Sequence, residues 1–518
     1  MGKKGKKKNA SAGSENKTSK HNKEILELCR EILDVVVKDF PLLPSAQWDE
    51  YIKIYDLIER IMQKQSDECI CWDGFSRDNH IEDFIAWFKS NGGVADKVQI
   101  HNFNKEGYGL IAVDNIKSEE VFVTVPKTIM MTLESAKTSS LGGLINKDPI
   151  LKSMPHAAIA LHVLCEKLNT ESEWKPYLDI LPSVYSTSLY FTPDDLKSLQ
   201  GTPTLGDALK PYRSIAKQYA YFYKLFQSES TAFKHPFTFD DFRWAVSTIM
   251  TRQNQVPISD TENIKALIPM WDMCNHSNGT IETGFDTKDE SCKSFAIRPF
   301  AKGDQIFIFY GKRNNADLLF HNGFVYPDNE HDFVNIHLGV SRSDRLYAMK
   351  AQIMAMVGID ASAHPYPVLR GDDPISPQLR AFLRIFSMDD DELKIRLFNP
   401  EKKKIPPLSD LTNSDVVISE KNELKSWHYL CMRLNLILSQ YKTTIEEDEK
   451  ELESTEENIN AKNCLLLRIT ERRILEQALE SVSSKFEEAM KKREEKERKE
   501  ENETLDSIEE KVEKLTVE

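Results

Sequence analysis

Long apolar runs are missing from this sequence of 518 residues. No stretch approaches the roughly 18–20 consecutive apolar residues that cross a bilayer as a helix, so we expect no transmembrane segment. The first eight residues hold five lysines and no apolar stretch, which argues against a secretory signal. Basic residues are also in the minority, with 68 Lys and Arg against 82 Asp and Glu and a net charge of −14. An acidic chain of this kind argues against nucleic acid as a partner.

Cysteine pairs of the kind that bind zinc are missing as well. The eight cysteines are scattered, no two are spaced as Cys-x-x-Cys, and the closest two are Cys69 and Cys71. A four-ligand zinc site needs closely spaced pairs, so we expect no metal, and free thiols in a reducing compartment. We therefore expect a cytoplasmic protein, and the lysine-rich N-terminus leaves a share in the nucleus open.

The hydrophobic pattern divides the chain into regions of different periodicity, and the fold class that it predicts is α+β. Apolar residues recur at helical spacing from Ile25 and again from Ile54, whereas short runs rich in Val, Ile and Phe begin near Val98. The predicted regions are a disordered basic tail over 1–21, a helical lead-in over 22–94, a strand-rich domain over 95–311 with a helical insert at about 136–265, an all-α region over 330–488, and a charged tail over 489–518 that is either a solvated helix or disordered.

A glycine pattern stands at the start of the strand-rich domain. Glu106–Ala112 reads Glu-Gly-Tyr-Gly-Leu-Ile-Ala and fits the fingerprint of dinucleotide-binding folds. That fingerprint binds a phosphate only where it joins a strand to a helix, and strand-like residues, Glu120–Val125, follow here instead. We therefore reject a Rossmann fold. The two glycines still allow either a tight turn or the close approach of another group.

Two further segments are ambiguous when each is taken alone. Ile268–His276 crowds Trp, Asp, Asn and His beside apolar residues, which fits a buried polar turn as well as a functional site. Ile306–Asn315 fits a core strand that ends in a tyrosine. The two segments become specific only together, in this order.

Arg252, Asn275 with His276, and Phe309–Gly311 resemble the signature of SET-domain methyltransferases. The helical insert and the helical region after Tyr310 resemble the Rubisco-type branch of that family. This resemblance implies a split SET domain with a pseudoknot at the Asn-His segment, followed by an all-α C-terminal substrate-binding domain. Four segments look, more narrowly, like the actin-histidine N-methyltransferases of the family: Ala220–Tyr223, Met250–Gln255, Trp271–Asn278 and Ser343–Lys350.

The resemblance implies S-adenosyl-L-methionine as the methyl donor and requires no metal. Tyr310 would be the catalytic tyrosine, and Arg77 and Arg252 would bind the carboxylate of the donor, which a planar guanidinium can pair with two bonds. The other predicted donor contacts are Glu106, Gly107, Tyr108, Asp272, Met273, Cys274, Asn275, His276 and Asn322.

The methyl acceptor that the resemblance implies is a histidine of actin. Neutralising a lysine with pKa ~10.4 costs ~4.6 kcal/mol at pH 7, whereas a histidine with pKa ~6.5 is already mostly neutral. Asn254 would hydrogen-bond one ring nitrogen and leave the other facing the methyl group, although an asparagine here also fits a helix C-terminal cap. Trp271, Ile308 and Tyr310 would form flat walls for the imidazole.

We therefore predict a protein-histidine N-methyltransferase that uses S-adenosylmethionine, acts on actin and is a monomer. Two alternatives remain open: a lysine methyltransferase of the same fold, and an inactive SET protein that only binds a partner. Retention of Arg252, Asn275, His276 and Tyr310 argues against the inactive protein, and Asn254 argues against the lysine enzyme.

Overall fold

The computed structural model describes residues 6–65, 76–229, 233, 237–259, 261–280, 283–398, 405–455 and 458–516. The chain divides into two compact units. The first comprises Met1–Asp195 and Gly206–Tyr326, and the second comprises Leu196–Leu205 and Pro327–Glu518.

The first unit combines many short helices with three small sheets. Its helices are α1 (Lys6–Val36), α2 (Pro44–Gln65), α3 (Ile81–Ser90), α4 (Leu133–Thr138), α5 (Gly142–Lys147), α6 (Pro149–Ser153), α7 (Pro155–Leu168), α8 (Lys175–Asp179), α9 (Leu205–Glu229), α10 (Phe239–Arg252) and α11 (Asn315–Asp317). Its single-turn helices are η1 (Arg77–His80), η2 (Lys127–Ile129), η3 (Ser188–Tyr190), η4 (Asp195–Leu199, shared with the second unit), η5 (Trp271–Met273) and η6 (Leu318–Asn322).

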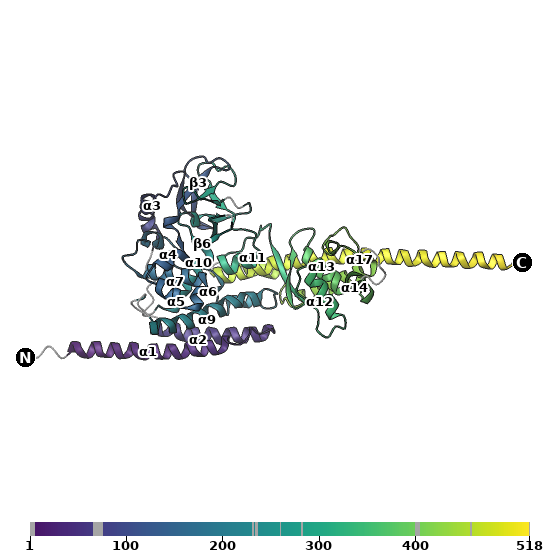
Figure 1. The fold of residues 1–518 in the computed structure, drawn as a ribbon, viewed down its shortest axis with the longest axis horizontal. Coiled ribbons are helices and arrows are strands. Elements are labelled where there is room, and N and C mark those ends of the chain that lie inside the picture. Colours follow the sequence, from purple (N-terminus) through teal and green to yellow (C-terminus); the bar gives the residue numbers. More distant parts are fainter. Residues whose placement is uncertain are drawn as a thin grey trace, which may run out of the picture. The chain divides into compact units, whose positions relative to one another are not determined.

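The strands of the first unit come from both halves of the predicted SET domain. They are β1 (Val98–Phe103), β2 (Gly107–Ala112), β3 (Val121–Pro126), β4 (Met131–Thr132), β5 (Asn254–Pro257), β6 (Asn263–Leu267), β7 (Asn275–His276), β8 (Thr283–Asp286), β9 (Ser291–Phe295) and β10 (Gln305–Ile308). The sheet orders are β1-β2-β10-β7, β3-β9-β8 and β4-β6-β5. Figure 1 shows these strands gathered at one end of the unit, beyond α4, α7 and α10.

One sheet joins the two halves of the split domain. β10 pairs antiparallel with β2 on one side and parallel with β7 on the other, in the register Phe307↔Asn275 and Ile308↔His276. The rejection of a Rossmann fold is thereby confirmed, because β2 is followed by the strand β3 rather than by a helix. The pairing sets the Asn-His segment directly beside the strand that leads to Tyr310.

The helical insert is shorter than the sequence predicts. The predicted span of 136–265 contains β5 and most of β6, which pair antiparallel with each other. α10 opens with the predicted capping box of Thr238 and Asp241 and is capped at its end by Gln253. The chain changes from helix to strand between Arg252 and Asn254, and Pro257 at the end of β5 would in any case exclude a helix that continued through it. Leu196–Leu205, also inside the predicted insert, belongs to the second unit.

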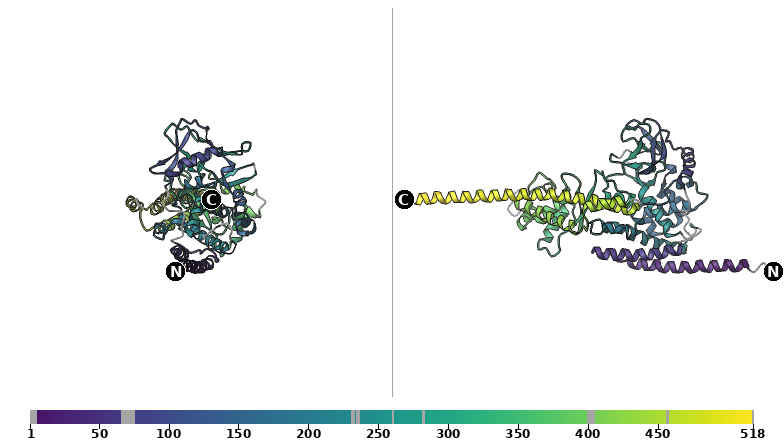
Figure 2. Two further views of the ribbon diagram at one scale, coloured as in Figure 1. Left: turned by 90° about the vertical axis from the view of Figure 1, so that its left-hand side faces the viewer. Right: turned by 180° about the vertical axis from the view of Figure 1, so that it is seen from behind.

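The N-terminal region forms a hairpin of two long helices (Figures 1 and 2). α1 begins at Lys6, so residues 6–21 are helical where the sequence predicts a disordered tail, and residues 1–5 lie outside the described part. Ile25, Leu28 and Ile32 are buried and fix the C-terminal half of α1. A helix once nucleated extends through residues that lack proline, which accounts for its longer N-terminal reach.

The second unit is mainly helical but not all-α as the sequence predicts. It contains α12 (Tyr347–Met356), α13 (Pro377–Ser387), α14 (Asp390–Leu397), η7 (Leu408–Leu411), α15 (Glu420–Leu438), α16 (Ile445–Ser454), α17 (Ile459–Thr516), and the two strands β11 (Phe333–Leu338) and β12 (His364–Leu369). Val334, Ile336 and Leu338 are buried at alternate positions, the period of a strand. β11 and β12 pair antiparallel and contact α17.

α17 is one continuous helix that includes most of the predicted charged tail (Figure 2). Its residues 491–500 are exposed and form ion pairs one turn apart, such as Arg493 with Glu497 at 2.7 Å. Of the two interpretations left open by the sequence, the solvated helix is therefore the one observed over residues 491–500, and the helical backbone continues to Thr516. Residues 517–518 lie outside the described part.

Three of the sequence expectations concern bonds and ligands rather than elements. The six cysteines that the structure describes are free thiols, and Cys69 and Cys71 lie outside the described residues. No helix in the described ranges is long and apolar enough to cross a membrane. Within the same ranges, no group of three or more His, Cys, Asp or Glu side chains is arranged to hold a metal ion.

A buried histidine lies in the middle of the helical insert. His162 on α7 is 2% exposed, and neither of its ring nitrogens has a hydrogen-bond partner in the described structure. Burial lowers the pKa of His162 to about 4, because the charged ring would lose its hydration, and Glu166, whose Oε1 lies 3.8 Å from Nδ1, does not offset that loss.

The stability of the first unit should therefore fall between pH 6.5 and pH 4. In that window the unfolded chain binds a proton at His162 and the folded chain does not, which removes about 3 kcal/mol of folding free energy by pH 4. His162→Leu should abolish this part of the pH dependence, as measured by denaturant unfolding at pH 7, 5.5 and 4.5. His428→Leu, at an exposed helical histidine, is the control. An unchanged pH slope in His162→Leu would contradict the assignment.

Candidate active site

Tyr310 lies just after β10 and is fixed at two points by the Asn-His segment. Its hydroxyl donates a 2.7 Å hydrogen bond to the carbonyl of Cys274, and its backbone N–H donates to Nδ1 of His276 at 3.2 Å. Burial raises the pKa of the Tyr310 phenol, so the group stays neutral at physiological pH. The phenol is therefore a positioned dipole rather than a base.

Aromatic rings surround His276. The centroids of Tyr310 and Tyr326 lie 5.1 and 5.3 Å from that of the imidazole, and those of Phe309 and Phe324 lie 5.8 and 6.0 Å away. The ring is 8% exposed and accepts the Tyr310 N–H. His276 thus anchors the loop that carries Tyr310.

Asn275 connects β7 to β2. Its side-chain amide donates to the Tyr108 carbonyl at 3.3 Å and to Oε1 of Gln305 at 2.8 Å. A Cβ atom at Gly109 would come within 2.8 Å of that amide, so glycine is required there. Gly107 has a φ of +70°, which favours glycine for its backbone alone. The two glycines of the rejected fingerprint thus serve a turn and a close approach.

Two arginines from distant parts of the chain converge on one sulfur atom. Nη2 of Arg77 lies 3.7 Å from Sδ of Met273, and Nη1 of Arg252 lies 3.8 Å from it. Arg77 also stacks over the ring of Tyr108 at 4.2 Å. The predicted carboxylate-binding pair is therefore brought together, one residue from the Cys274 carbonyl that Tyr310 contacts.

The charge of Arg252 is balanced by Asp272. Nη1 of Arg252 lies 3.1 Å from Oδ2 of Asp272 and donates to the Asp272 carbonyl at 2.8 Å. Oδ2 also accepts a 2.7 Å hydrogen bond from the hydroxyl of Tyr177. The side chain of Asp272 is 0% exposed and that of Arg252 is 13% exposed. The carboxylate of Asp272 is therefore buried within the protein and orients Arg252, and the predicted contact of Asp272 with the donor stays a prediction.

Two positive charges share this single carboxylate. Burial and the charge of Arg252 together lower the pKa of Arg77 to about 10, so the guanidinium stays protonated at pH 7 but is not fully compensated. Nε of Arg77 donates to the Ile180 carbonyl at 2.6 Å, a neutral partner. An anion placed between the two guanidinium groups would remove this repulsion.

Asn322 and Glu106 occupy the margins of the site. The amide of Asn322 donates to the Thr251 carbonyl at 3.2 Å, next to Arg252, and its oxygen accepts from Arg313 at 2.8 Å. The following Gly323 has a φ of +85° and lies against Ser186, so a side chain is excluded there. Glu106 is exposed in the turn before β2.

Asn254 is the first residue of β5 and not a helix cap. α10 ends at Arg252 with Gln253 as its cap, and the Asn254 side chain accepts a hydrogen bond from the Gln255 N–H at 2.9 Å. Trp271 donates from Nε1 to Thr283 on β8, which contacts β5. Ile308 is 5% exposed at the end of β10. In the described structure no hydrogen bond or ring contact joins Asn254 to Trp271 or Tyr310.

Three features of the site have no signal in the sequence. Tyr177 lies about 95 residues before its partner Asp272, a separation that periodicity cannot bridge. Met270 has a φ of +71°, a strained value for a bulky residue, at the start of η5. Phe324 and Tyr326 complete the rings around His276.

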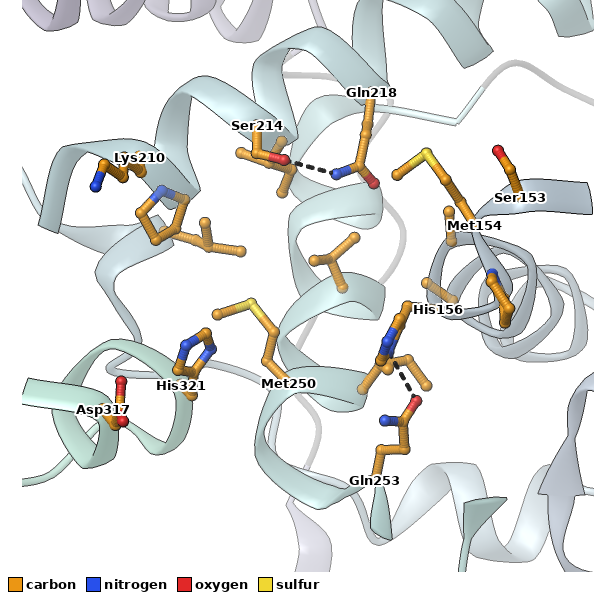
Figure 3. A pocket seen from close by; sticks show the side chains of 18 of the residues that line it. Ser153, Met154, His156, Lys210, Ser214, Gln218, Met250, Gln253, Asp317 and His321 are labelled. Carbon is orange, nitrogen blue, oxygen red and sulfur yellow. Dashed lines mark hydrogen bonds between the residues drawn. The ribbon is translucent and has the colours of Figure 1, made fainter. Parts of the chain in front are cut away.

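A cavity of about 780 Å³ lies beside the site, within the first unit (Figure 3). Its apolar walls include Met154, Ala157, Ala160, Leu189, Ile215, Ile249 and Met250, and its polar residues include His156, Lys210, Ser214, Gln253, Arg313, Asp317 and His321. Gln253 and His321 directly precede Asn254 and Asn322 in the sequence. The nitrogen Nδ1 of His156 lies 3.1 Å from Oε1 of Gln253.

Comparisons with known proteins agree with this geometry. Residues 107–311 match the SET domain, and residues 341–475 match the Rubisco LSMT substrate-binding domain. A solved structure of Rubisco LSMT bound to AdoMet superposes with a TM-score of 0.65 at 23% identity, covering 79% of this chain and 93% of that one. At that identity the likeness establishes the fold.

Curated relatives are more similar in sequence. The actin-histidine N-methyltransferase of Papio anubis is 44% identical over 488 residues, covering 93% of this chain and 81% of the relative. Those of Gallus gallus and Homo sapiens are 44% and 43% identical and cover 94% and 96% of this chain and 82% and 84% of their own lengths. On this similarity, and with both halves of the split domain joined at Asn275 and Tyr310, the chain belongs to the SET-domain family of actin-histidine N-methyltransferases.

Proposed function

We propose that this protein transfers a methyl group from S-adenosylmethionine to an imidazole nitrogen of a histidine in actin. The observation that carries the proposal is the convergence of Arg77 and Arg252 on Met273, one residue from the oxygen pair formed by the Cys274 carbonyl and the Tyr310 hydroxyl. An anchor for an anion thus adjoins a patch of electron-rich oxygen atoms. That is the combination a carboxylate-bearing sulfonium donor requires.

The residues present fit such a donor. Two guanidinium groups share one buried carboxylate and retain an uncompensated charge, which a ligand carboxylate would balance. The donor, once bound, supplies a methyl group on a positively charged sulfur. Glu106, Gly107 and Tyr108 would contribute backbone groups, and Met273, Cys274, Asn275, His276 and Asn322 would line the rest of its site.

Tyr310 acts by alignment and not by taking a proton. Its phenol is neutral, and its hydroxyl is held on the Cys274 carbonyl, so the two oxygens keep a fixed direction. Methyl transfer is an in-line displacement that needs the reacting atoms ~3–3.5 Å apart and water excluded, which can contribute several kcal/mol. The aromatic rings packed around His276 help to keep Tyr310 in this position.

Histidine is the acceptor that needs the least catalytic assistance from this site. An imidazole is mostly neutral at pH 7, so no general base is required, and only the choice of ring nitrogen remains. Asn254 can make that choice by hydrogen-bonding one nitrogen, because the one side-chain partner that it has among the described residues is the N–H of the adjacent Gln255. Trp271, Ile308 and Tyr310 would then pack against the imidazole ring of the target histidine.

Actin as the substrate is supported by the names of the relatives and by the shape of the first unit. A cavity of about 780 Å³ is much larger than an imidazole and has mostly apolar walls. It suits side chains that flank the target histidine in a protein chain. The second unit carries the match to a substrate-binding domain and is proposed to contact the substrate as well.

Two alternatives remain. A lysine methyltransferase of the same fold would have to bind a neutral amine, and an inactive binding protein would have no need of the arginine pair. The deciding experiment incubates the protein with methyl-labelled S-adenosylmethionine and actin, and locates the label by mass spectrometry. Label on a histidine supports the proposal, label on a lysine supports the first alternative, and donor binding without transfer supports the second.

Replacing Arg252 should weaken donor binding. Arg252→Lys keeps the charge but loses the fork that can hold a carboxylate, so the Kd for S-adenosylmethionine should rise about 10- to 100-fold, or ~1.4–2.7 kcal/mol. Arg243→Lys is the control, because Arg243 lies on the same helix and pairs with Asp240. Calorimetric titration measures both. Equal Kd values for wild type and Arg252→Lys would remove this arginine from the donor site.

The identity of the acceptor should depend on Asn254. Asn254→Ala should lower histidine methylation by about 5- to 150-fold, the value of one oriented hydrogen bond of ~1–3 kcal/mol, and leave donor affinity unchanged. Asn254→Phe should also raise the relative rate on a peptide with lysine in place of the target histidine, most at pH 9. The measurement is the ratio of initial rates on the two peptides. Constant ratios in both variants would show that Asn254 does not select the acceptor.

Filling the cavity should affect the protein substrate alone. Ser214 is exposed on α9 and lines the cavity, so Ser214→Trp places a ring there without disturbing the core. We expect the KM for actin to rise at least tenfold while the Kd for the donor stays constant. Lys217→Trp, exposed on the same helix but outside the cavity lining, is the matched control. The proposed role of the cavity is wrong if the two variants have the same KM for actin.

A further inference from the structure

We propose that Tyr177 is a positioning residue for the methyl donor and that the short helix α8 sets the spacing of the two arginines of the donor site. The inference rests on the proposed function, because it assigns a role toward the donor carboxylate. Tyr177 itself is 0% exposed and touches no ligand. It acts through Asp272 and Arg252.

Arg77 is held by the end of α8. Its Nε donates a 2.6 Å hydrogen bond to the carbonyl of Ile180, the residue that caps this helix. A carbonyl at a helix C-terminus carries partial negative charge and lacks a helical partner, so it suits a guanidinium. The bond leaves the rest of the Arg77 guanidinium directed toward Met273.

Arg252 is held by the middle of α8 through a carboxylate. The Tyr177 hydroxyl donates to Oδ2 of Asp272 at 2.7 Å, and the same oxygen faces Nη1 of Arg252 at 3.1 Å. Oδ1 of Asp272 and Nε of Arg252 are both buried without a hydrogen-bond partner in the described structure. The ion pair is therefore joined through one oxygen, with a free donor and a free acceptor left beside it.

That one-oxygen arrangement needs an outside restraint. An arginine and a carboxylate ordinarily pair through two parallel hydrogen bonds, which would also satisfy the free Nε and Oδ1. The Tyr177 hydroxyl fixes Oδ2 and so opposes the rotation of Asp272 that would form this fork. Without it, the guanidinium of Arg252 is drawn further onto Asp272 and away from the exposed side of the site.

Tyr177 is itself rigidly held. Its ring stacks on Trp87 of α3 with a centroid distance of 6.5 Å and an interplanar angle of 13°, and it lies 6.2 Å from Phe84. Asp179, two residues later, accepts a 3.1 Å bond from Lys167 of α7. α8 is thus fastened to two other helices, so both arginines take their spacing from one stiff turn.

The experiment separates the carboxylate of the donor from the rest of it. Tyr177→Phe keeps the stacked ring and removes only the hydroxyl. Its Kd, and that of wild type, are measured by calorimetry for S-adenosylmethionine and for the decarboxylated analogue, which retains the sulfonium and the adenosine. Tyr219→Phe is the matched control, because Tyr219 is a fully buried tyrosine whose hydroxyl accepts one side-chain bond from Gln65.

We expect Tyr177→Phe to weaken S-adenosylmethionine binding roughly 5- to 30-fold, the loss of one hydrogen bond to a charged group. Its affinity for the decarboxylated analogue should change less than twofold, and Tyr219→Phe should leave both values unchanged. Equal loss for both ligands would mean general damage to the fold, and no loss for either would mean that α8 does not position Arg252; each result overturns the inference. Failure of the wild-type protein to bind S-adenosylmethionine would instead overturn the proposed function.

Discussion

The active site depends on a parallel pairing only two residues long. Asn275 and His276 lie beside Phe307 and Ile308 of β10, and β10 in turn lies beside β2. Residues 107–112, 275–276 and 305–310 are brought into one layer by this contact. Parallel pairs are slightly weaker per residue than antiparallel ones. The side chains therefore reinforce it, with the Asn275 amide bonded across to β2 and His276 bonded to the Tyr310 N–H.

Charge burial is the second constraint on the site. Two guanidinium groups lie close together in a poorly hydrated region, and Asp272 is bonded to Arg252 but acts on Arg77 only through its charge. Such an arrangement is unfavourable in the absence of an anion and becomes favourable when one binds, which directs the binding free energy to the carboxylate of a ligand. The same reasoning explains why neutral groups, the Ile180 carbonyl and the Tyr177 hydroxyl, restrain the pair instead of further acids. Additional acidic side chains would neutralise the two guanidinium groups and so cancel their attraction for the carboxylate of a ligand.

The sequence indicated the segments that the structure brings together, but not what each residue does there. Asn275, His276 and Tyr310 came from the family resemblance of two segments that are ambiguous when each is taken alone, and their roles toward the donor stay predictions. Contacts between distant segments could not be predicted from the sequence. Tyr177, for example, meets Asp272 only because α8 packs against α3 and α7. The end of α10 shows that local residue preferences do not fix where a helix ends. An asparagine such as Asn254 fits a helix cap, but here the pairing of β5 with β6 makes it the first residue of a strand.

The proton balance of the site bears on the choice of acceptor independently of Asn254. The groups that lie nearest the Cys274 carbonyl cannot serve as bases at neutral pH, because burial raises the pKa of Tyr310, and the carboxylate of Asp272 is buried away from any substrate and paired through Oδ2 with Arg252 and Tyr177. An acceptor must therefore arrive without its proton. For lysine that condition costs ~4.6 kcal/mol at pH 7, equivalent to a more than thousandfold smaller reactive population, whereas for histidine it costs almost nothing. A site that offers a neutral phenol and a carbonyl and, among the described groups nearest to them, no base thus favours imidazole, which is mostly neutral at pH 7, as the acceptor.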